Sequence, residues 1–267
     1  MDDVLKRNNV SIYGEAGKPV MVFAHGYGCD QNVWSAVIEA FEQDYQIIVF
    51  DYVGAGKSDL SAYSTEKYAS LEGYTEDIFD IYACLNLKDT ILVAHSVSCM
   101  VGLLAAIKKP ELFSKLIFIG PSPRYINDDA YHGGFTSEDI DGLFEMMDDN
   151  YLGWSRALAP SIMGNSDRPV LGESLTNTFC ATDPTIAKQF ARVTFLSDNR
   201  KDLPNLGVPS LTLQCVSDII APVEVGSYMN KNMLNNTLVV MNATGHCPHM
   251  SAPKETIDLI KSYLHSN

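Results

Sequence analysis

A serine lies at the centre of the segment Ala94-His95-Ser96-Val97-Ser98, between an apolar run and a helical run. The segment is similar to the nucleophile-elbow pattern G-x-S-x-G, in which a tight turn after a strand presents a serine hydroxyl above the next helix. Both glycines of that pattern are replaced, by Ala94 and Ser98, whose side chains are small enough to fit beside the turn. Ser96 is therefore a candidate nucleophile, and the alternative is a structural serine at a strand end.

A serine hydroxyl is a weak nucleophile, so it needs a general base and a carboxylate that orients the base. Asp218 follows the predicted strand 208–215, and His246 follows the predicted strand 236–242. Serine, acid and histidine thus occur in the order expected of hydrolases with this elbow. Each residue alone could be a turn or loop residue, but their joint order and placement favour a Ser96–Asp218–His246 triad. His246 and His249 have no third ligand at a useful spacing, so neither a metal nor another cofactor is expected.

Backbone N–H groups that could stabilise a developing oxyanion come from two places in the sequence. Val97 N–H lies at the start of the helix after Ser96, and Tyr27 N–H lies in the loop after the first long strand. Gly26 and Gly28 flank Tyr27 and allow that loop to turn sharply. We therefore predict that Tyr27 and Val97 form an oxyanion hole.

The elements that must position these residues alternate along the chain. Six apolar runs, several of them rich in β-branched residues, are typical of strands buried on both faces of a parallel sheet. They are residues 19–25, 46–52, 90–96, 115–120, 208–215 and 236–242. Helical patterns lie between them, for example over 72–87, and an amphipathic helix over 254–265 would close the domain. The alternation predicts an α/β fold with a mostly parallel, doubly wound sheet.

The alternation is interrupted between residues 124 and 200. No strand pattern occurs there, whereas helical patterns do, for example over 137–158 and 183–196. We therefore predict a helical cap at 124–200, inserted into a core domain formed by 1–123 and 201–267.

Composition narrows the class of partner and the compartment. The net charge of −14 argues against nucleic acid and anionic membranes, which select basic surfaces. No apolar stretch is long enough to span a bilayer, and the first ten residues carry no apolar signal segment. The six cysteines are scattered and none forms a C-x-x-C pair, which predicts free thiols and a cytoplasmic location.

Six longer segments carry a resemblance to a known family. The chain resembles the α/β-hydrolase superfamily and, within it, the branch that holds the bacterial stress regulator RsbQ and the plant strigolactone and karrikin receptors, with RsbQ nearest. The segments are HGYGCDQNVW (25–34), FDYVGAGKSDL (50–60), AHSVSCMVG (94–102), GPSPRYIND (120–128), FCATDP (179–184) and GHCPHMS (245–251). The resemblance implies the α/β-hydrolase fold, the same triad and oxyanion hole, and a V-shaped cap of four helices over an apolar pocket. It also implies that Ser96 cleaves small hydrophobic esters or lactones.

The resemblance further suggests pocket walls and a partner. Phe135, Trp154 and Phe195 in the cap, and Ile219 after the acid, would line the pocket, although cap aromatics could equally pack the helices together. A ligand-sensing role would add a regulatory protein such as a phosphatase as partner. Eight acidic residues without a Lys or Arg between them offer either a solvated surface or a docking face for such a partner: Asp128, Asp129, Glu138, Asp139, Asp141, Glu145, Asp148 and Asp149.

Overall fold

A single twisted sheet forms the centre of the protein, whose computed structural model describes residues 2–266. The strands follow the order β1-β3-β2-β4-β5-β6-β7, and all neighbouring pairs are parallel except β1 with β3. Their bounds are β1 (Ser11–Tyr13), β2 (Val20–Ala24), β3 (Gln46–Val49), β4 (Thr90–His95), β5 (Phe113–Ile119), β6 (Ser210–Ser217) and β7 (Asn236–Thr244). The six predicted apolar runs are β2 to β7. The short edge strand β1 was not predicted, because two of its three side chains are exposed and leave no apolar pattern.

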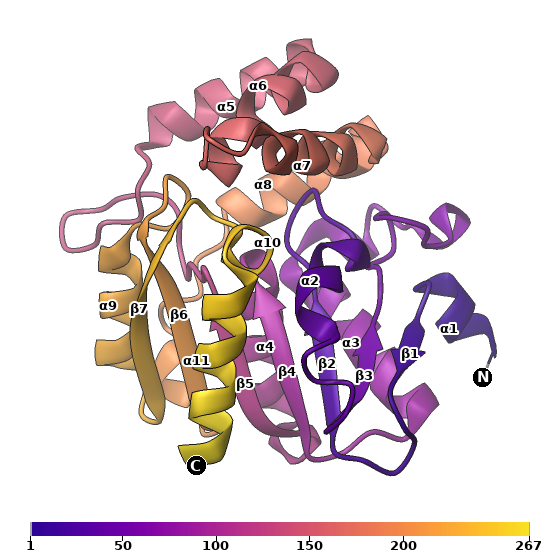
Figure 1. Ribbon diagram of the computed structural model, residues 1–267. Coiled ribbons are helices and arrows are strands. Elements are labelled where there is room, and N and C mark those ends of the chain that lie inside the picture. Colours follow the sequence, from indigo (N-terminus) through magenta and orange to yellow (C-terminus); the bar gives the residue numbers. More distant parts are fainter. Residues whose placement is uncertain (1, 267) are drawn as a thin grey trace.

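Helices cover both faces of the sheet, with α2 and α11 in front of it and α3 and α4 behind it (Figure 1). Burial on both faces explains why central strands such as β4 are apolar at nearly every position. The helices of this core domain are α1 (Asp2–Arg7), α2 (Ser35–Ile38), α3 (Leu71–Leu85), α4 (Val97–Lys108), α9 (Val223–Asn232), α10 (Pro248–Ser251) and α11 (Pro253–Ser266). The expected doubly wound α/β arrangement is confirmed.

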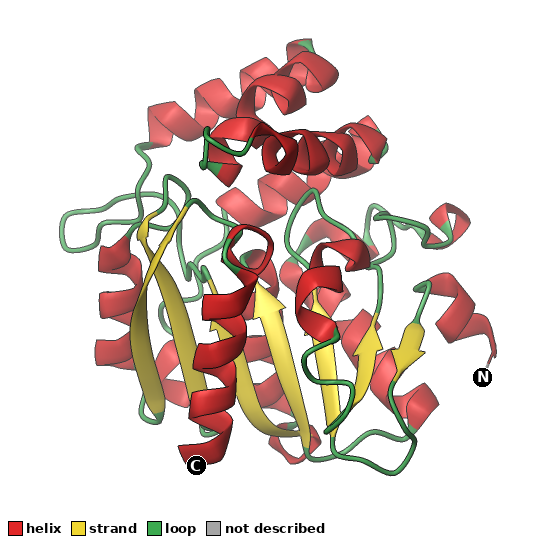
Figure 2. Cartoon of the chain, in the orientation of Figure 1, coloured by secondary structure: helices red, strands yellow, loops and turns green. Residues whose placement is uncertain are grey.

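Four further helices lie above the carboxyl ends of the strands, and no strand occurs among them (Figure 2). They are α5 (Ser137–Asp149), α6 (Tyr151–Met163), α7 (Pro169–Ala181) and α8 (Pro184–Phe195). The helical pattern over 137–158 is two helices, because Asn150 leaves helical geometry and its side chain accepts a hydrogen bond from Gly153 N–H at the start of α6. The cap therefore has the expected four helices, and it closes over the strand ends where the candidate triad lies.

Candidate active site

Ser96 occupies a strained turn between β4 and α4. Its φ is +57° and its ψ is −126°, a left-handed conformation that is costly for a residue with a side chain. Ser96 N–H donates to the carbonyl of Ile119 at 2.9 Å, which ties the turn to the neighbouring strand β5. This is the geometry of a nucleophile elbow, held by a buried strand on one side and a buried helix on the other.

The two residues that replace the elbow glycines are both accommodated. Ala94 is fully buried in β4, and Ser98 is fully buried in the first turn of α4. The Ser98 hydroxyl donates a hydrogen bond to the carbonyl of His25, at the start of the loop that carries Tyr27. Ser98 therefore fastens the elbow helix to that loop.

The three residues of the predicted triad form one hydrogen-bonded chain. His246 Nε2 lies 2.8 Å from Ser96 Oγ, and His246 Nδ1 lies 2.7 Å from Asp218 Oδ2. The other carboxylate oxygen of Asp218 accepts from the backbone N–H groups of Ile220 at 2.8 Å and Ala221 at 3.2 Å. The carboxylate is thereby fixed in one orientation, and all three triad side chains are buried. A nucleophile, a base and an orienting acid in this geometry can perform nucleophilic acyl transfer.

Two further histidines lie behind the base. His95 Nε2 lies 2.9 Å from the carbonyl oxygen of His246. The ring of His249 lies 4.4 Å from the ring of His95 and 4.5 Å from the ring of Trp34. Burial and the neighbouring His246 lower the pKa of His249 to about 3, and burial with His249 lowers that of His95. Both rings are therefore neutral at pH 7 and add no charge behind the triad.

The loop with the predicted oxyanion donor passes directly over the serine. A Cβ atom placed on Gly26 would lie 2.6 Å from His95 Nδ1 and 3.1 Å from Ser96 Cβ, so only glycine allows this approach. Tyr27 follows Gly26 and lines the same cavity as Ser96. Val97 is the first residue of α4, so its N–H has no acceptor within the helix. The structure thus brings both predicted donors beside Ser96, and their role as an oxyanion hole stays a prediction.

The cavity above Ser96 is small and almost wholly apolar. Its volume is about 30 Å³, close to the share of one water molecule in the liquid. The cap contributes six of the thirteen lining residues, and the strand ends and loops of the core contribute the other seven. The lining residues are Tyr27, Cys29, His95, Ser96, Tyr125, Ile162, Leu175, Phe179, Thr194, Phe195, Ile220, His246 and Cys247.

Of the four predicted wall residues, only Phe195 lines this cavity. Trp154 lies one layer back, with its ring 6.5 Å from that of Tyr27, and the Phe135 ring lies 6.1 Å from that of Phe195. Ile219 is 52% exposed and is not among the lining residues, which corrects our expectation, whereas Ile220 is 4% exposed and lines the cavity. The Asp218 carboxylate caps the turn and thereby sets which of the two isoleucines faces inward.

Sequence reasoning missed several lining residues, above all the cap side chains Ile162, Leu175 and Phe179. Each lies on the buried face of its helix, so its apolar character could be read from the sequence. Their convergence on Ser96 could not, because it depends on how the cap folds back over the core.

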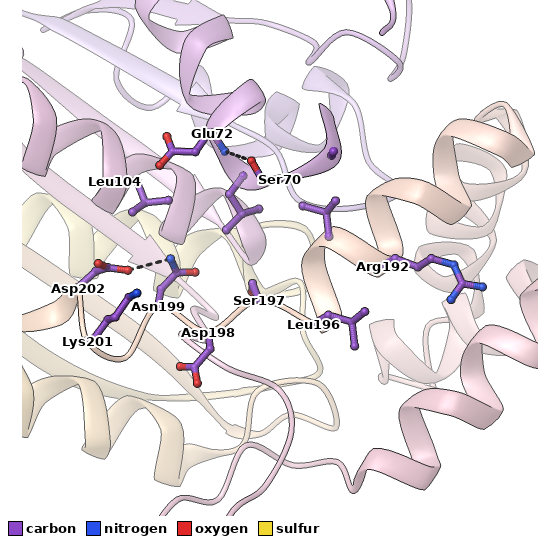
Figure 3. Close-up of a pocket in the computed structure, with 13 residues that line it drawn as sticks. Ser70, Glu72, Leu104, Arg192, Leu196, Ser197, Asp198, Asn199, Lys201 and Asp202 are labelled. Carbon is purple, nitrogen blue, oxygen red and sulfur yellow. Dashed lines mark hydrogen bonds between the residues drawn. The ribbon is translucent and has the colours of Figure 1, made fainter. Parts of the chain in front are cut away.

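A larger groove of about 550 Å³ lies elsewhere, between the end of α8 and the helices α3 and α4 (Figure 3). Ser70 and Glu72 border it on one side, and Leu196 and Asp198 border it on the other. No triad residue lines this groove, so it is not the reaction site. Within residues 2–266, no helix is both long and apolar enough to cross a bilayer.

Comparison with known proteins agrees with this fold. A family model described as "Alpha/beta hydrolase family" matches residues 21–259. The chain is 37% identical to "Karrikin insensitive 2 receptor CA" of Petunia hybrida over 266 residues, covering 99% of this chain and 98% of that protein. It is 37% identical to "Strigolactone esterase RMS3" of Pisum sativum over 252 residues, covering 94% of each. A solved structure of a hydrolase from Oleispira antarctica superimposes with a TM-score of 0.97 at 41% identity, covering 100% of this chain and 97% of that one.

These matches and the triad geometry define the class of protein. The chain belongs to the α/β-hydrolase family. Within that family it is related to proteins named as strigolactone esterases and karrikin receptors.

Proposed function

We propose that the protein is a serine hydrolase of small hydrophobic esters or lactones. The observation that carries this proposal is the unbroken hydrogen-bonded chain from Asp218 through His246 to Ser96, directly below an apolar cavity. His246 Nε2 takes the proton of the Ser96 hydroxyl while Oγ attacks the carbonyl carbon, and Asp218 stabilises the imidazolium that forms. The N–H groups of Tyr27 and Val97 bind the oxyanion.

The second half of the reaction uses the same groups in reverse. The imidazolium of His246 returns its proton to the leaving alkoxide, and the acyl group stays on Ser96 Oγ. His246 then deprotonates a water molecule that attacks the acyl carbon, and the acid product leaves as the proton returns to Ser96. The products are one alcohol and one carboxylic acid, or one hydroxy acid where the substrate is a lactone.

The nature of the substrate follows from the wall of the cavity and from the relatives. An apolar lining with few polar groups suits a small hydrophobic ligand. The names of two relatives refer to a lactone-type signal and to a receptor, which favours a lactone-like compound. By its resemblance to RsbQ, the protein would serve stress or small-molecule signalling. None of the six cysteines forms a disulfide, which suits a reducing cytoplasm.

A second candidate function is that of a sensor, in which the same site binds or slowly cleaves a signal and the cap engages a regulatory protein such as a phosphatase. The acidic residues of the cap differ in whether they already have partners within the protein. Three of them already have partners within the protein. Asp128 pairs with Arg200, Asp148 pairs with Arg192, and Asp139 accepts a hydrogen bond from the backbone at the N-terminus of α5. The exposed residues Glu138, Asp141, Glu145 and Asp149 follow each other at spacings of three or four along α5, so they share one face of the helix.

This acidic face would dock a basic patch on the partner. Charge reversal at Glu138 and Asp141 should then weaken binding of the regulatory protein without changing ester cleavage. Unchanged partner affinity in that double variant would remove the docking role and leave the hydrolase.

The first experiment follows p-nitrophenol release from acetate and butyrate esters, from milliseconds to an hour, in the native protein and in Ser96→Ala. Steady turnover that disappears in Ser96→Ala supports a hydrolase. A burst of about one equivalent followed by almost no release supports a sensor with a slowly resolved acyl-enzyme. No release above the level of Ser96→Ala would overturn the catalytic proposal.

A further inference from the structure

The corner between the cap helices α6 and α7 touches the loop that carries the catalytic histidine. His246 N–H donates to the carbonyl of Ile162, in the last turn of α6, at 2.9 Å. The chain before His246 approaches so closely that a Cβ on Gly245 would lie 2.0 Å from the carbonyl oxygen of Met163. Gly245 has a φ of +82°, so both space and backbone conformation require glycine there. The backbone of the base is therefore bonded to the cap.

Two polar side chains of the same corner extend this connection. Asn165 Nδ2 donates to the carbonyl of Thr244 at 3.0 Å, and Arg168 Nη1 donates to the carbonyl of Ser251 at 2.6 Å. These two acceptors lie on either side of His246 in the sequence. Arg168 Nη2 also donates to Asn165 Oδ1, so the two side chains support each other. Asn165 and Arg168 together clamp both ends of the histidine loop.

The small size of the cavity makes this clamp relevant to the reaction. Its volume of about 30 Å³ holds no more than about one water molecule, so an ester can reach Ser96 only when the cap moves. Ile162 and Leu175, on the two helices that meet at the corner, are among the cap residues that line the cavity, which His246 also lines. The clamp bonds the α6–α7 corner to the histidine loop, so we expect this corner to stay in place while the remainder of α6 and α7 yields to the substrate.

Other cap contacts are less suited to this task. The exit of the cap after α8 borders the open groove of about 550 Å³ rather than the histidine loop (Figure 3). The ion pairs of that exit join Asp198 to Arg124 and Arg200, all of them outside the cavity lining. The α6–α7 corner is thus the part of the cap that is bonded to the base.

We propose that Asn165 and Arg168 are positioning residues for His246, which keep its imidazole aligned between Ser96 and Asp218 while the cap admits substrate. The proposal rests on the hydrolase function proposed above. Neither side chain contacts the reacting atoms, so their effect is on the orientation of the base.

The test compares Asn165→Gly, Arg168→Met and Arg168→Lys in the full-length protein. Glycine suits position 165 because Asn165 has a φ of +56°, so this change removes the side chain without backbone strain. With p-nitrophenyl acetate, Asn165→Gly and Arg168→Met should lower kcat by about 10- to 100-fold with little change in KM, as expected for a misaligned catalytic group. Arg168→Lys keeps a donor for the Ser251 carbonyl but loses the fork to Asn165, so it should restore part of the rate.

A second measurement does not depend on turnover. The proton in the hydrogen bond between His246 Nδ1 and Asp218 should give a downfield NMR resonance, assigned by its loss in His246→Ala. Asn165→Gly and Arg168→Met should shift or broaden this resonance. Arg156→Met is the matched control, because Arg156 is exposed on α6 and its side chain forms no hydrogen bond or ion pair within residues 2–266.

The outcomes separate the two proposals. Clamp variants that lose thermal stability but keep the native kcat, KM and resonance would show a purely structural clamp and overturn the inference. If the native protein releases no p-nitrophenol above Ser96→Ala, the proposed function fails, and the resonance alone then decides whether the clamp orients His246. A clamp variant that behaves like Arg156→Met in both measurements would also overturn it.

Discussion

Ser98 shows how a residue that departs from a motif can acquire a structural role. Its hydroxyl donates to the buried carbonyl of His25, next to the loop that passes over Ser96. A glycine in the same place would leave that carbonyl without this donor. The left-handed turn at Ser96 therefore forms in this protein although Ser98, rather than glycine, lies two residues after it.

This bond predicts the effect of Ser98→Ala. The change leaves the His25 carbonyl buried without this donor, so the free energy of unfolding should fall by about 1–3 kcal/mol. Urea denaturation measures this free energy of unfolding. Ser161→Ala, which removes an exposed hydroxyl on α6, is the control and should change stability by less than about 0.5 kcal/mol. Equal stability of the two variants would contradict the role given to Ser98.

The sequence predicted the residues that the structure joins in a triad, because each follows a strand and parallel strands end at one edge of the sheet. It could not predict that Ile220 rather than Ile219 faces the cavity. The direction of a side chain in a tight turn has no periodicity, and here it is set by the hydrogen bonds from Ile220 and Ala221 to Asp218.

At the scale of the elements, the cap helix α7 contacts both the cavity and the loop that carries Tyr27. A Cβ on Gly28 would lie 2.4 Å from the ring of Phe179, so this helix packs tightly on the loop that carries Tyr27. The Phe179 ring also lies 5.5 Å from the ring of Tyr27 and lines the cavity. Phe179 therefore occupies space that a longer acyl group would need.

Phe179→Leu should shift the preference of the protein from acetate toward butyrate esters. The smaller side chain enlarges the cavity, at a cost of about 1–2 kcal/mol of stability for the lost apolar contacts. The measurement is the ratio of kcat/KM for p-nitrophenyl butyrate and acetate. Phe144→Leu, a buried change on α5 outside the cavity lining, should leave the ratio unchanged. An unchanged ratio in Phe179→Leu would mean that Phe179 does not limit acyl length.

Element boundaries were harder to predict than the elements themselves. The apolar pattern over 137–158 runs through Asn150 without a break, and only the cap formed by the Asn150 side chain separates α5 from α6. By contrast, β2 to β6 were predictable because strands buried on both faces are mostly apolar. The edge strand β7 was predictable from its apolar run, although most of its residues are not fully buried.

At the scale of the whole molecule, the two ends of the cap are joined by a cluster of charges. Asp198 accepts from Arg124 at 2.8 Å and from Arg200 at 2.7 Å, and Arg200 also pairs with Asp128. The bond from Arg200 lowers the pKa of Asp198 from 3.8 to about 2. The entrance and exit of the cap are thereby held together by an ionised carboxylate.

The lowered pKa predicts a dependence of stability on acid. Because the folded pKa lies below the ordinary value, the contribution of Asp198 is complete above pH about 4 and is lost as the pH falls through about 2. Asp198→Asn should therefore be less stable than the native protein at pH 7, and the difference should shrink toward pH 2. Urea denaturation at several pH values measures this, with the exposed Asp149→Asn as control. A difference that does not vary with pH would contradict the assignment.

The two tryptophans lie in different parts of the molecule, one in the core and one in the cap. Trp34 is buried in the core against His249, and Trp154 lies on the cap helix α6 against Tyr27. Indole emission depends on the polarity of its surroundings, so Trp34→Phe would leave a single emitter that senses the cap alone. The cap therefore carries its own optical reporter, and the cap movement inferred for substrate entry can be timed without an attached dye.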